Sequence, residues 1–195
     1  MDGDAISRVT RALQLRLEHA LHSSGESSGV VFVGPLDDPD AQTASLILFL
    51  YRLVPNASLR NGEHRTLAPQ PPHGLRVSRQ SFPLDLYYLV TVGTRQGISD
   101  VTLQRRLGYA IRELHLDPEL VGAEVDHEAV HVTFETLTTE EASRIWTLFP
   151  TANYRTSVAY LASPVWLDPE IDIPEAAPVT QDSLIAGARA AENAT

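Results

Sequence analysis

The most constraining feature of this chain is an unbroken apolar run, Leu46–Tyr51, inside the stretch Ser45–Asn61 (SLILFLYRLVPNASLRN). The run is short, contains Ile, Phe and Tyr, and is followed by a turn signal at Pro55-Asn56. This pattern predicts a strand buried on both faces inside a sheet. The run is too short to cross a bilayer, which takes about 20 residues. We expect Leu46–Leu50 to lie in the core and Tyr51–Asn61 to lead out of the sheet toward neighbouring molecules.

The remaining hydrophobic pattern predicts an α+β fold. Apolar residues recur at helical spacing in some segments and alternate in others, in an order typical of helices packed on a mixed or antiparallel sheet of about five strands. We expect a single domain over residues 1–168 and an acidic, Pro- and Ala-rich tail over residues 169–195. The expected elements are about three helices, at 6–21, from Ser99 and from the Thr138–Glu141 capping box, and strands at 30–33, 46–55, 84–92, 130–135 and 154–167.

Composition excludes several classes of function. The formal net charge of −10 argues against a nucleic-acid partner and against contact with an anionic membrane, since both require a positive field. The chain has no Cys, which excludes thiolate chemistry and Cys-ligated metals. We find no residues that suggest a cofactor. The first residues lack the basic and apolar regions of a signal peptide, so we expect assembly in the cytoplasm.

The longest stretch without helix or strand periodicity runs from Pro55 to Pro83. It is rich in Pro and basic residues in an otherwise acidic chain, and long irregular segments in compact domains are usually functional. We therefore expect a partner-binding loop. The candidate contacts with a neighbouring subunit or tube are Tyr51, Arg52, Asn56, Arg60, Arg65, Arg76 and Arg79.

Residues His127–His131 match H-E-x-x-H, the pattern of zinc proteases. In those enzymes both His lie on one face of a helix and bind one zinc ion, while the Glu polarises water. Here His131 falls in an alternating strand pattern, which separates the two His by about 13 Å at about 3.3 Å per residue. We therefore expect no metal and no catalysis from His127, Glu128 and His131, although a zinc-dependent hydrolase is the alternative function that the sequence raises.

Two features bear on how the chain meets partners. Asp85 interrupts the apolar segment 84–92, and we expect it to be a paired structural charge or a residue on an exposed face, and not a general base. Pro164 interrupts the last strand, which indicates a bulge or a sheet edge. An edge there would accept an extra strand from a partner. Its candidate residues are Tyr154, Val158, Tyr160, Pro164 and Trp166.

Several segments, taken in order, resemble one family. Together they cover roughly residues 5–168 and resemble the tail-terminator (cap) family of Photorhabdus-virulence-cassette-type contractile injection systems, which is similar to the tail terminators of contractile phages. The segments are FLYRLVPNASLRN (49–61), the Pro-rich stretch 69–72, PLDLYYLVT (83–91), LGYAIRELHLDP (107–118), LTTEEASRIWTLF (137–149) and YRTSVAYLASPVWLD (154–168).

The resemblance implies a structural role. It suggests a hexameric ring that ends the inner tube and anchors the last sheath ring, with sheath subunits, tube subunits and other copies of the chain as partners. It implies no enzyme activity and no cofactor. It leaves open whether the particle stays in the cytosol, is anchored or is released. A small binding module of similar α+β build is the further alternative.

Overall fold

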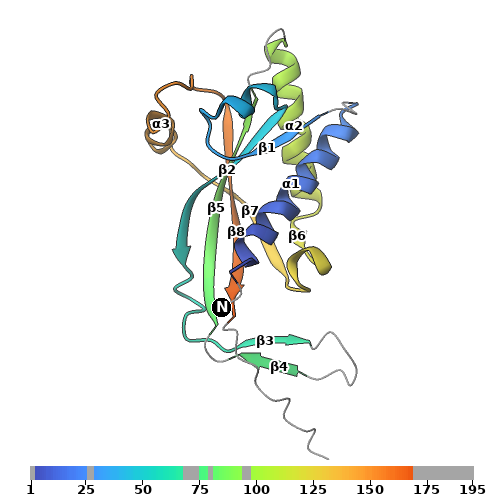
Figure 1. Ribbon diagram of the computed structural model, residues 1–195, viewed down its shortest axis with the longest axis vertical. Coiled ribbons are helices and arrows are strands. Elements are labelled where there is room, and N and C mark those ends of the chain that lie inside the picture. Colours follow the sequence, from blue (N-terminus) through green and yellow to red (C-terminus); the bar gives the residue numbers. More distant parts are fainter. Residues whose placement is uncertain (1–2, 26–28, 68–74, 79–80, 94–97, 169–195) are drawn as a thin grey trace, which may run out of the picture.

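The computed structural model describes residues 3–25, 29–67, 75–78, 81–93 and 98–168, with only the backbone for 66–67 and 75–78. Three α-helices pack on a six-stranded mixed sheet, and a separate two-stranded hairpin lies beyond the lower end of that sheet (Figure 1). The elements are α1 (Ala5–Ser23), β1 (Val31–Val33), η1 (Pro39–Thr43), β2 (Leu46–Pro55), β3 (His64–Leu67), β4 (Leu75–Ser78), β5 (Phe82–Val92), α2 (Asp100–Leu116), β6 (Glu119–Leu120), η2 (Ala123–Val125), β7 (Val130–Glu135), α3 (Thr139–Thr147) and β8 (Ser157–Leu167).

The sheet has the strand order β1-β2-β5-β8-β7-β6. The β1–β2 pair is parallel and every other pair is antiparallel. The predicted α+β class, single domain and three helices are confirmed. The expected number of strands is slightly low, because the short strand β6 has too few residues to show a period in the sequence.

The apolar run behaves as predicted in its first half. Leu46, Ile47 and Leu48 are all buried, and β2 lies between β1 and β5 at these residues. The second half differs from the prediction. Strand β2 does not leave the sheet at Tyr51 but continues to Pro55, with a register irregularity between Leu50 and Arg52. The extra residue of this bulge keeps β2 paired with β5 and changes which side chains face the helices.

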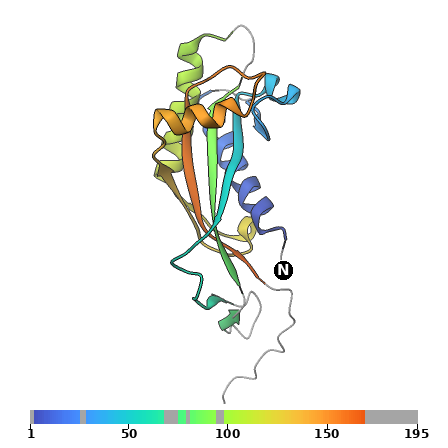
Figure 2. The ribbon, with the colours of Figure 1, turned by 90° about the vertical axis from the view of Figure 1, so that its left-hand side faces the viewer.

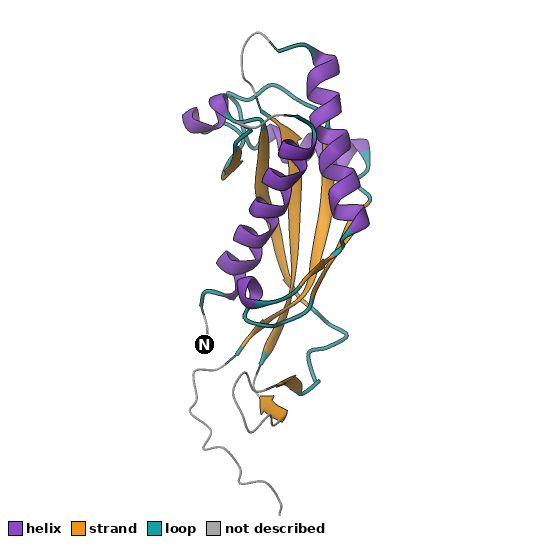
Figure 3. Ribbon diagram, turned by 90° about the vertical axis from the view of Figure 1, so that its right-hand side faces the viewer, coloured by secondary structure: helices purple, strands orange, loops and turns teal. Residues whose placement is uncertain are grey.

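The two faces of the sheet are covered unequally. Helices α1 and α2 lie across one face and bury the larger core, in which Leu13, Leu17 and Leu21 of α1 contact the sheet (Figure 3). Helix α3 crosses only the upper part of the other face, where Trp146 and Phe149 pack over Ile47 and Leu89 (Figure 2). The lower part of that second face carries no helix among the described residues, so its side chains form an open surface.

Local sequence signals account for the ends of several elements. The Ser99 side chain accepts a hydrogen bond from the Thr102 N–H at the start of α2, and the predicted capping box of Thr138 and Glu141 opens α3. Strand β5 is followed by Gly93, where a Cβ atom would lie 1.8 Å from the Ala44 carbonyl oxygen. Only glycine fits that close approach of two backbone segments.

The prediction for residues 55–83 is wrong in one respect. The stretch is not an irregular loop throughout, because residues 64–67 and 75–78 pair as an antiparallel hairpin. Its strands are only four residues long and contain His, Ser and three Arg or Thr side chains. Leu75 and Val77 alternate with Arg76 and Ser78, but four residues are too few for this alternation to stand out as a strand signal.

Candidate functional site

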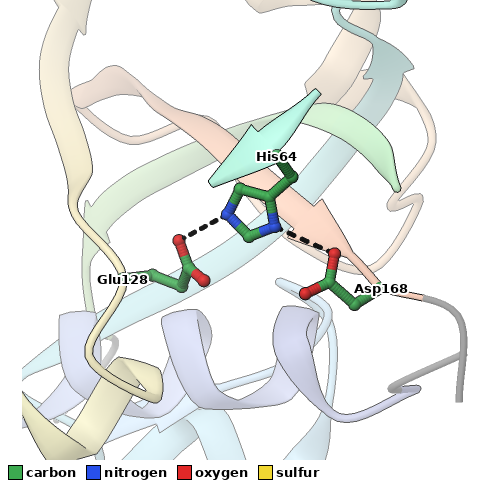
Figure 4. Close-up of side chains that lie close together, drawn as sticks. All are labelled: His64, Glu128 and Asp168. Carbon is green, nitrogen blue, oxygen red and sulfur yellow. Dashed lines mark hydrogen bonds and ion pairs between the residues drawn. The ribbon is translucent and has the colours of Figure 1, made fainter. Parts of the chain in front are cut away.

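A buried imidazole joins the hairpin to the main sheet. His64 lies at the start of β3 and is only 5% exposed. Its Nε2 lies 2.9 Å from a Glu128 carboxylate oxygen, and its Nδ1 lies 2.9 Å from an oxygen of Asp168 (Figure 4). Glu128 precedes β7 and Asp168 directly follows β8, so three distant parts of the chain meet at this ring. We call His64, Glu128 and Asp168 the latch.

Neighbouring groups fix the latch in place. The imidazole stacks on the Trp166 indole, with ring centroids 4.4 Å apart and planes 13° apart. The Ser81 hydroxyl, immediately before β5, donates a short hydrogen bond to Asp168. Arg8 of α1 lines a small cavity together with both latch carboxylates. The hairpin is therefore connected to the ends of β5 and β8 and to the loop before β7.

The charge state of the latch follows from its geometry. Burial alone lowers the pKa of His64, because a buried cation loses its hydration. The hydrogen bonds to Glu128 and Asp168 and the attraction of their carboxylates outweigh burial, so the pKa lies above its ordinary value. Both ring nitrogens must carry a proton to donate to two carboxylates at once. The two carboxylates therefore favour the protonated, positively charged form of the His64 ring.

The same three residues deserve comparison with a metal site. One ligand atom from each lies within 4.8 Å of the others, a spacing compatible with a shared cation. However, the two carboxylates lie against opposite nitrogens of one ring, and a zinc ion bound to either nitrogen would displace one of these hydrogen bonds. The arrangement favours a bound proton over a bound metal.

The H-E-x-x-H pattern does not form a zinc-protease site. His127 is exposed with a positive φ of 61°, and His131 lies in β7 with an exposed side chain. The motif therefore spans a turn and a strand, as its alternation predicted. Glu128 instead bonds to His64, a residue that no local pattern connects with it. Neither His64 nor Asp168 was predicted, because His64 lies 64 positions from Glu128 and 104 positions from Asp168 along the chain.

The open lower part of the second sheet face contains part of the predicted interface. Arg52 lies over the Tyr87 ring, 4.8 Å from its centroid, and Tyr51 packs edge-on against the same ring at 6.2 Å. Burial raises the pKa of Tyr51 to about 12, so its hydroxyl stays protonated as a neutral donor. Tyr51 and Arg52 thus both contact the Tyr87 ring beside α3, and Tyr51 also packs against the cluster that holds Trp146 and Phe149. That these residues contact a neighbouring molecule stays a prediction.

Asn56 and Asp85 end this surface. The Asn56 side-chain amide donates to an Asp85 oxygen at 2.9 Å, and the Ser163 hydroxyl donates to the same oxygen at 2.5 Å. Asn56 also accepts hydrogen bonds from the backbone N–H groups of Ser58 and Leu59, which forms the turn after β2. The expectation of a paired structural charge at Asp85 is confirmed, and Asn56 has a structural role here.

The predicted arginines are not gathered in one loop. Arg60 is exposed in the turn that follows Asn56, and Arg65 is exposed on β3, where it pairs with Glu63 at 3.0 Å. Arg76 lies on β4 beside Thr66 in the register of the hairpin. Arg79 lies outside the described residues. The hairpin thus carries Arg65 and Arg76 on adjacent strands.

The prediction of a strand-accepting edge at Pro164 is wrong. Strand β8 is an interior strand, paired with β5 on one side and with β7 on the other. Pro164, which follows a cis peptide bond, sits at a bulge opposite Asp85 of β5 and beyond the last β7 pair at Ser163. Proline is tolerated there because no ladder hydrogen bond from its nitrogen is needed at the bulge.

The other residues of that predicted edge have different environments. Tyr154 precedes β8 and is exposed, with its ring 5.6 Å from that of Trp146. Val158 is half-buried, Tyr160 is buried against the helices, and Trp166 stacks on the latch histidine. None of these side chains lies on a free sheet edge.

Comparisons with known proteins identify the fold. The chain resembles the sheath/tube terminator of PVC, an extracellular contractile injection system, in its extended state, with a TM-score of 0.60, 17% identity and coverage of 96% of this chain and 65% of that chain. It also resembles the tube-terminating cap of the anti-feeding prophage, with a TM-score of 0.57, 18% identity and coverage of 91% and 60%. The chain spans less than two thirds of either structure.

The fold is therefore that of tube-terminating caps of contractile injection systems. A family model described as the Pvc16 N-terminal domain matches residues 8–181. The chain belongs to this family, which confirms the resemblance drawn from its segments. A comparison with curated proteins finds no match. No helix among the described residues is long and apolar enough to cross a membrane.

Proposed function

We propose that this chain is a structural cap of a contractile injection system. Copies form a homohexameric ring that ends the inner tube and anchors the last sheath ring, with tube and sheath subunits as partners. The ring assembles in the cytoplasm, has no enzymatic activity, and contacts neither nucleic acid nor membrane. The observation that carries this proposal is membership in the Pvc16 N-terminal domain family, supported by the similar folds of two caps.

Two surfaces of the subunit suit contacts within such an assembly. A ring with cyclic symmetry needs two different complementary surfaces on each subunit. The first is the open lower face of the sheet, with Tyr51, Arg52 and Tyr87. The second is the β3–β4 hairpin, which projects beyond the sheet and carries Arg65 and Arg76. On a chain with a net charge of −10, such arginines fit carboxylates of a neighbouring acidic copy.

The role is tested by removing the cap from the particle. Particles assembled without this protein should have tubes of irregular length or an uncapped end opposite the baseplate when examined by negative-stain electron microscopy. Adding the protein back should restore a uniform length. Particles of normal length with closed ends in its absence would show that the chain is not the terminator.

The hairpin surface is tested by charge reversal. Changing Arg65 and Arg76 together to Glu should abolish ring formation and capping, because it replaces two cations with repelling charges at an acidic contact. Reversal of Arg144 is the matched control, since Arg144 is an exposed arginine on α3 that pairs with Glu140 of its own helix. Hexamers of normal mass by mass photometry, together with normal particles, would refute the role of the hairpin but not that of the cap.

A further inference from the structure

Strand β7 has an open hydrogen-bonding edge. On the side away from β8 it pairs with β6 only at Val130 and His131. The Val132 N–H on that side donates to the Pro118 carbonyl at 2.7 Å. Because backbone groups of alternate strand residues point the same way, the N–H and C=O of Phe134 also point to this side. No strand of the described chain pairs with them there.

A groove runs beside this edge. Its volume is about 330 Å³, and it lies between the last turns of α2 and strand β7. Phe134 is 58% exposed at its rim and packs edge-on against Tyr160, with ring centroids 5.5 Å apart. The Tyr160 hydroxyl is buried and has no hydrogen-bond partner among the described residues. The lining residues are Ile111, Leu114, His115, Pro118, His131, Val132, Thr133, Phe134 and Tyr160.

The outer edge of β2 is also open, but it contains features that hinder the addition of a strand. Beyond Leu48, no described strand pairs with the outer side of β2, but β2 contains a bulge at Tyr51, a charge at Arg52 and a terminal Pro55. These are the devices by which proteins prevent strand addition at an edge. The free part of β7 contains no proline and no bulge, and its one charged residue, Glu135, lies at the end of the strand. An open edge next to an apolar groove, together with a buried hydroxyl that lacks an acceptor, fits an incoming extended peptide.

The chain itself contains a segment of matching chemistry. Residues 170–173, Glu-Ile-Asp-Ile, alternate acidic and apolar side chains, which is the pattern of a strand with one buried face. In that conformation Ile171 and Ile173 would enter the groove while Glu170 and Asp172 face outward. The groove lining contains two histidines and no carboxylate, so an acidic strand meets no like charge in it.

Geometry requires this segment to come from another copy. Val132 pairs with Ala162, and Asp168 lies about 20 Å further along the direction of β8 at about 3.3 Å per residue. Residues 169–173 span at most about 17 Å when fully extended. This is shorter than the distance from Asp168 to Val132 in the same copy. The segment therefore cannot reach Val132 and also lie along β7 of its own copy.

We propose that the open edge of β7 and the groove beside α2 take up residues 169–173 of a neighbouring copy as an added strand. The inference deepens the proposed ring and rests on it for the presence of that neighbour. It gives the ring a directional contact, with a donated segment on one side of each subunit and an accepting edge on the other. A head-to-tail contact of this kind gives a ring when the rotation between successive copies closes.

Disulfide trapping tests the contact directly, because the natural chain has no cysteine. One full-length protein carries Thr133→Cys, on the exposed side of β7, and the other carries Asp172→Cys or, for the shifted register, Glu170→Cys. Mixing the two under oxidising conditions should give a covalent dimer, identified by mass spectrometry of the joined peptides. Ser143→Cys on the exposed face of α3 is the matched control and should give at least tenfold less.

A second pair of variants separates the segment from the rest of the tail. Changing Ile171 and Ile173 to Asp should lower trapping at least tenfold, whereas changing Leu184 and Ile185 to Asp should leave it unchanged. Circular dichroism of each variant checks that the sheet is still folded. Phe134→Pro, which removes the outward N–H of β7, should have the same effect as the Ile changes, with circular dichroism as the check on folding.

The outcomes distinguish this inference from the proposed cap. Native mass spectrometry of the same samples, and imaging of assembled particles, report whether rings form. Rings without covalent dimers in either register would overturn the strand contact and leave the cap standing. Trapping within a single copy, in a protein carrying both cysteines, would also overturn it. Absence of rings both in solution and on particles would overturn the contact and the cap together.

Discussion

Raising the pH should release the β3–β4 hairpin from the sheet, because the latch is held by a buried imidazolium. His64 has a pKa above its ordinary value in the folded chain, owing to Glu128 and Asp168. In the unfolded chain His64 has a pKa of about 6.5, and in the folded chain its pKa is higher. Below about pH 6.5 the protonated ring contributes its full stabilisation to the folded state, and this stabilisation is lost as the pH rises through the pKa of the folded state. Deprotonation leaves two carboxylates facing a neutral ring that can donate to only one of them.

The magnitude can be worked from the contacts. A hydrogen bond to a charged group contributes about 1.5–3 kcal/mol, and removing one partner of a buried ion pair costs about 3–5 kcal/mol. The latch carboxylates retain 23% exposure, so water compensates part of the loss and the lower end of the range applies. We expect His64→Ala to destabilise the attached hairpin by about 3 kcal/mol near pH 6, and by much less at high pH.

Trp166 provides the assay, because its indole stacks on the His64 ring. The chain has two Trp, so Trp146→Phe leaves Trp166 as the sole emitter. Phe is well tolerated at position 146 because the buried indole N–H there has no hydrogen-bond partner among the described residues. A stacked imidazolium quenches indole emission. Emission should therefore rise with pH, with a midpoint above about 6.5.

Two controls make the result decisive. His64→Gln should abolish the transition, and Asp168→Asn should move its midpoint down, since one of the two attracting charges is lost. Emission that does not change between about pH 5 and pH 9, or a midpoint below about 6.5, would refute the buried imidazolium. Binding of zinc at one equivalent with quenching that does not depend on His64 protonation would favour a metal site instead.

Three further predictions concern the folded core and its caps, each measured as the free energy of unfolding in urea. Leu48→Ala should lose about 3–5 kcal/mol, because Leu48 is fully buried between the sheet and α1, and a loss below 1 kcal/mol would contradict its position in the core. Asn56→Ala should lower the free energy of unfolding by about 1–2 kcal/mol, because it removes hydrogen bonds to the turn after β2 and to Asp85. An unchanged free energy of unfolding would show that these contacts do not form in solution. Thr138→Ala should lose about 1 kcal/mol from the capping box of α3, whereas the neighbouring exposed Thr139→Ala should be near neutral.

How much of the fold the sequence predicts depends on the range of the interaction. Local signals were sufficient for α2 and α3, where a cap residue and a helical stripe coincide. They were also sufficient for β5 and the start of β2, where apolar runs are long. They failed for the β3–β4 hairpin, whose strands are short and polar, and for the bulge at Tyr51, which changes the pairing without changing the pattern. Bulges are set by the partner strand, and one chain segment does not reveal its partner.

The candidate site shows the same division. The contact of Tyr51 and Arg52 with Tyr87 follows from the pairing of β2 with β5, two strands that their apolar runs predict. The latch could not, because His64, Glu128 and Asp168 meet only after the sheet has formed. Pro164 was misinterpreted for a related reason. A proline excludes one hydrogen bond from a strand, but only the full strand order shows that a bulge, and not an edge, accommodates it.

The latch and the segment proposed to be donated are adjacent in the chain, and this connects them physically. Asp168 is bonded to His64, and the segment proposed to enter the neighbouring groove begins at the next residue. A fixed Asp168 limits where residues 169–173 can go, which lowers the conformational entropy lost when they bind. Releasing Asp168, by high pH or by His64→Gln, should therefore reduce trapping between Thr133→Cys and Asp172→Cys. If trapping is unchanged by His64→Gln, the latch holds the hairpin alone and has no part in directing the donated strand.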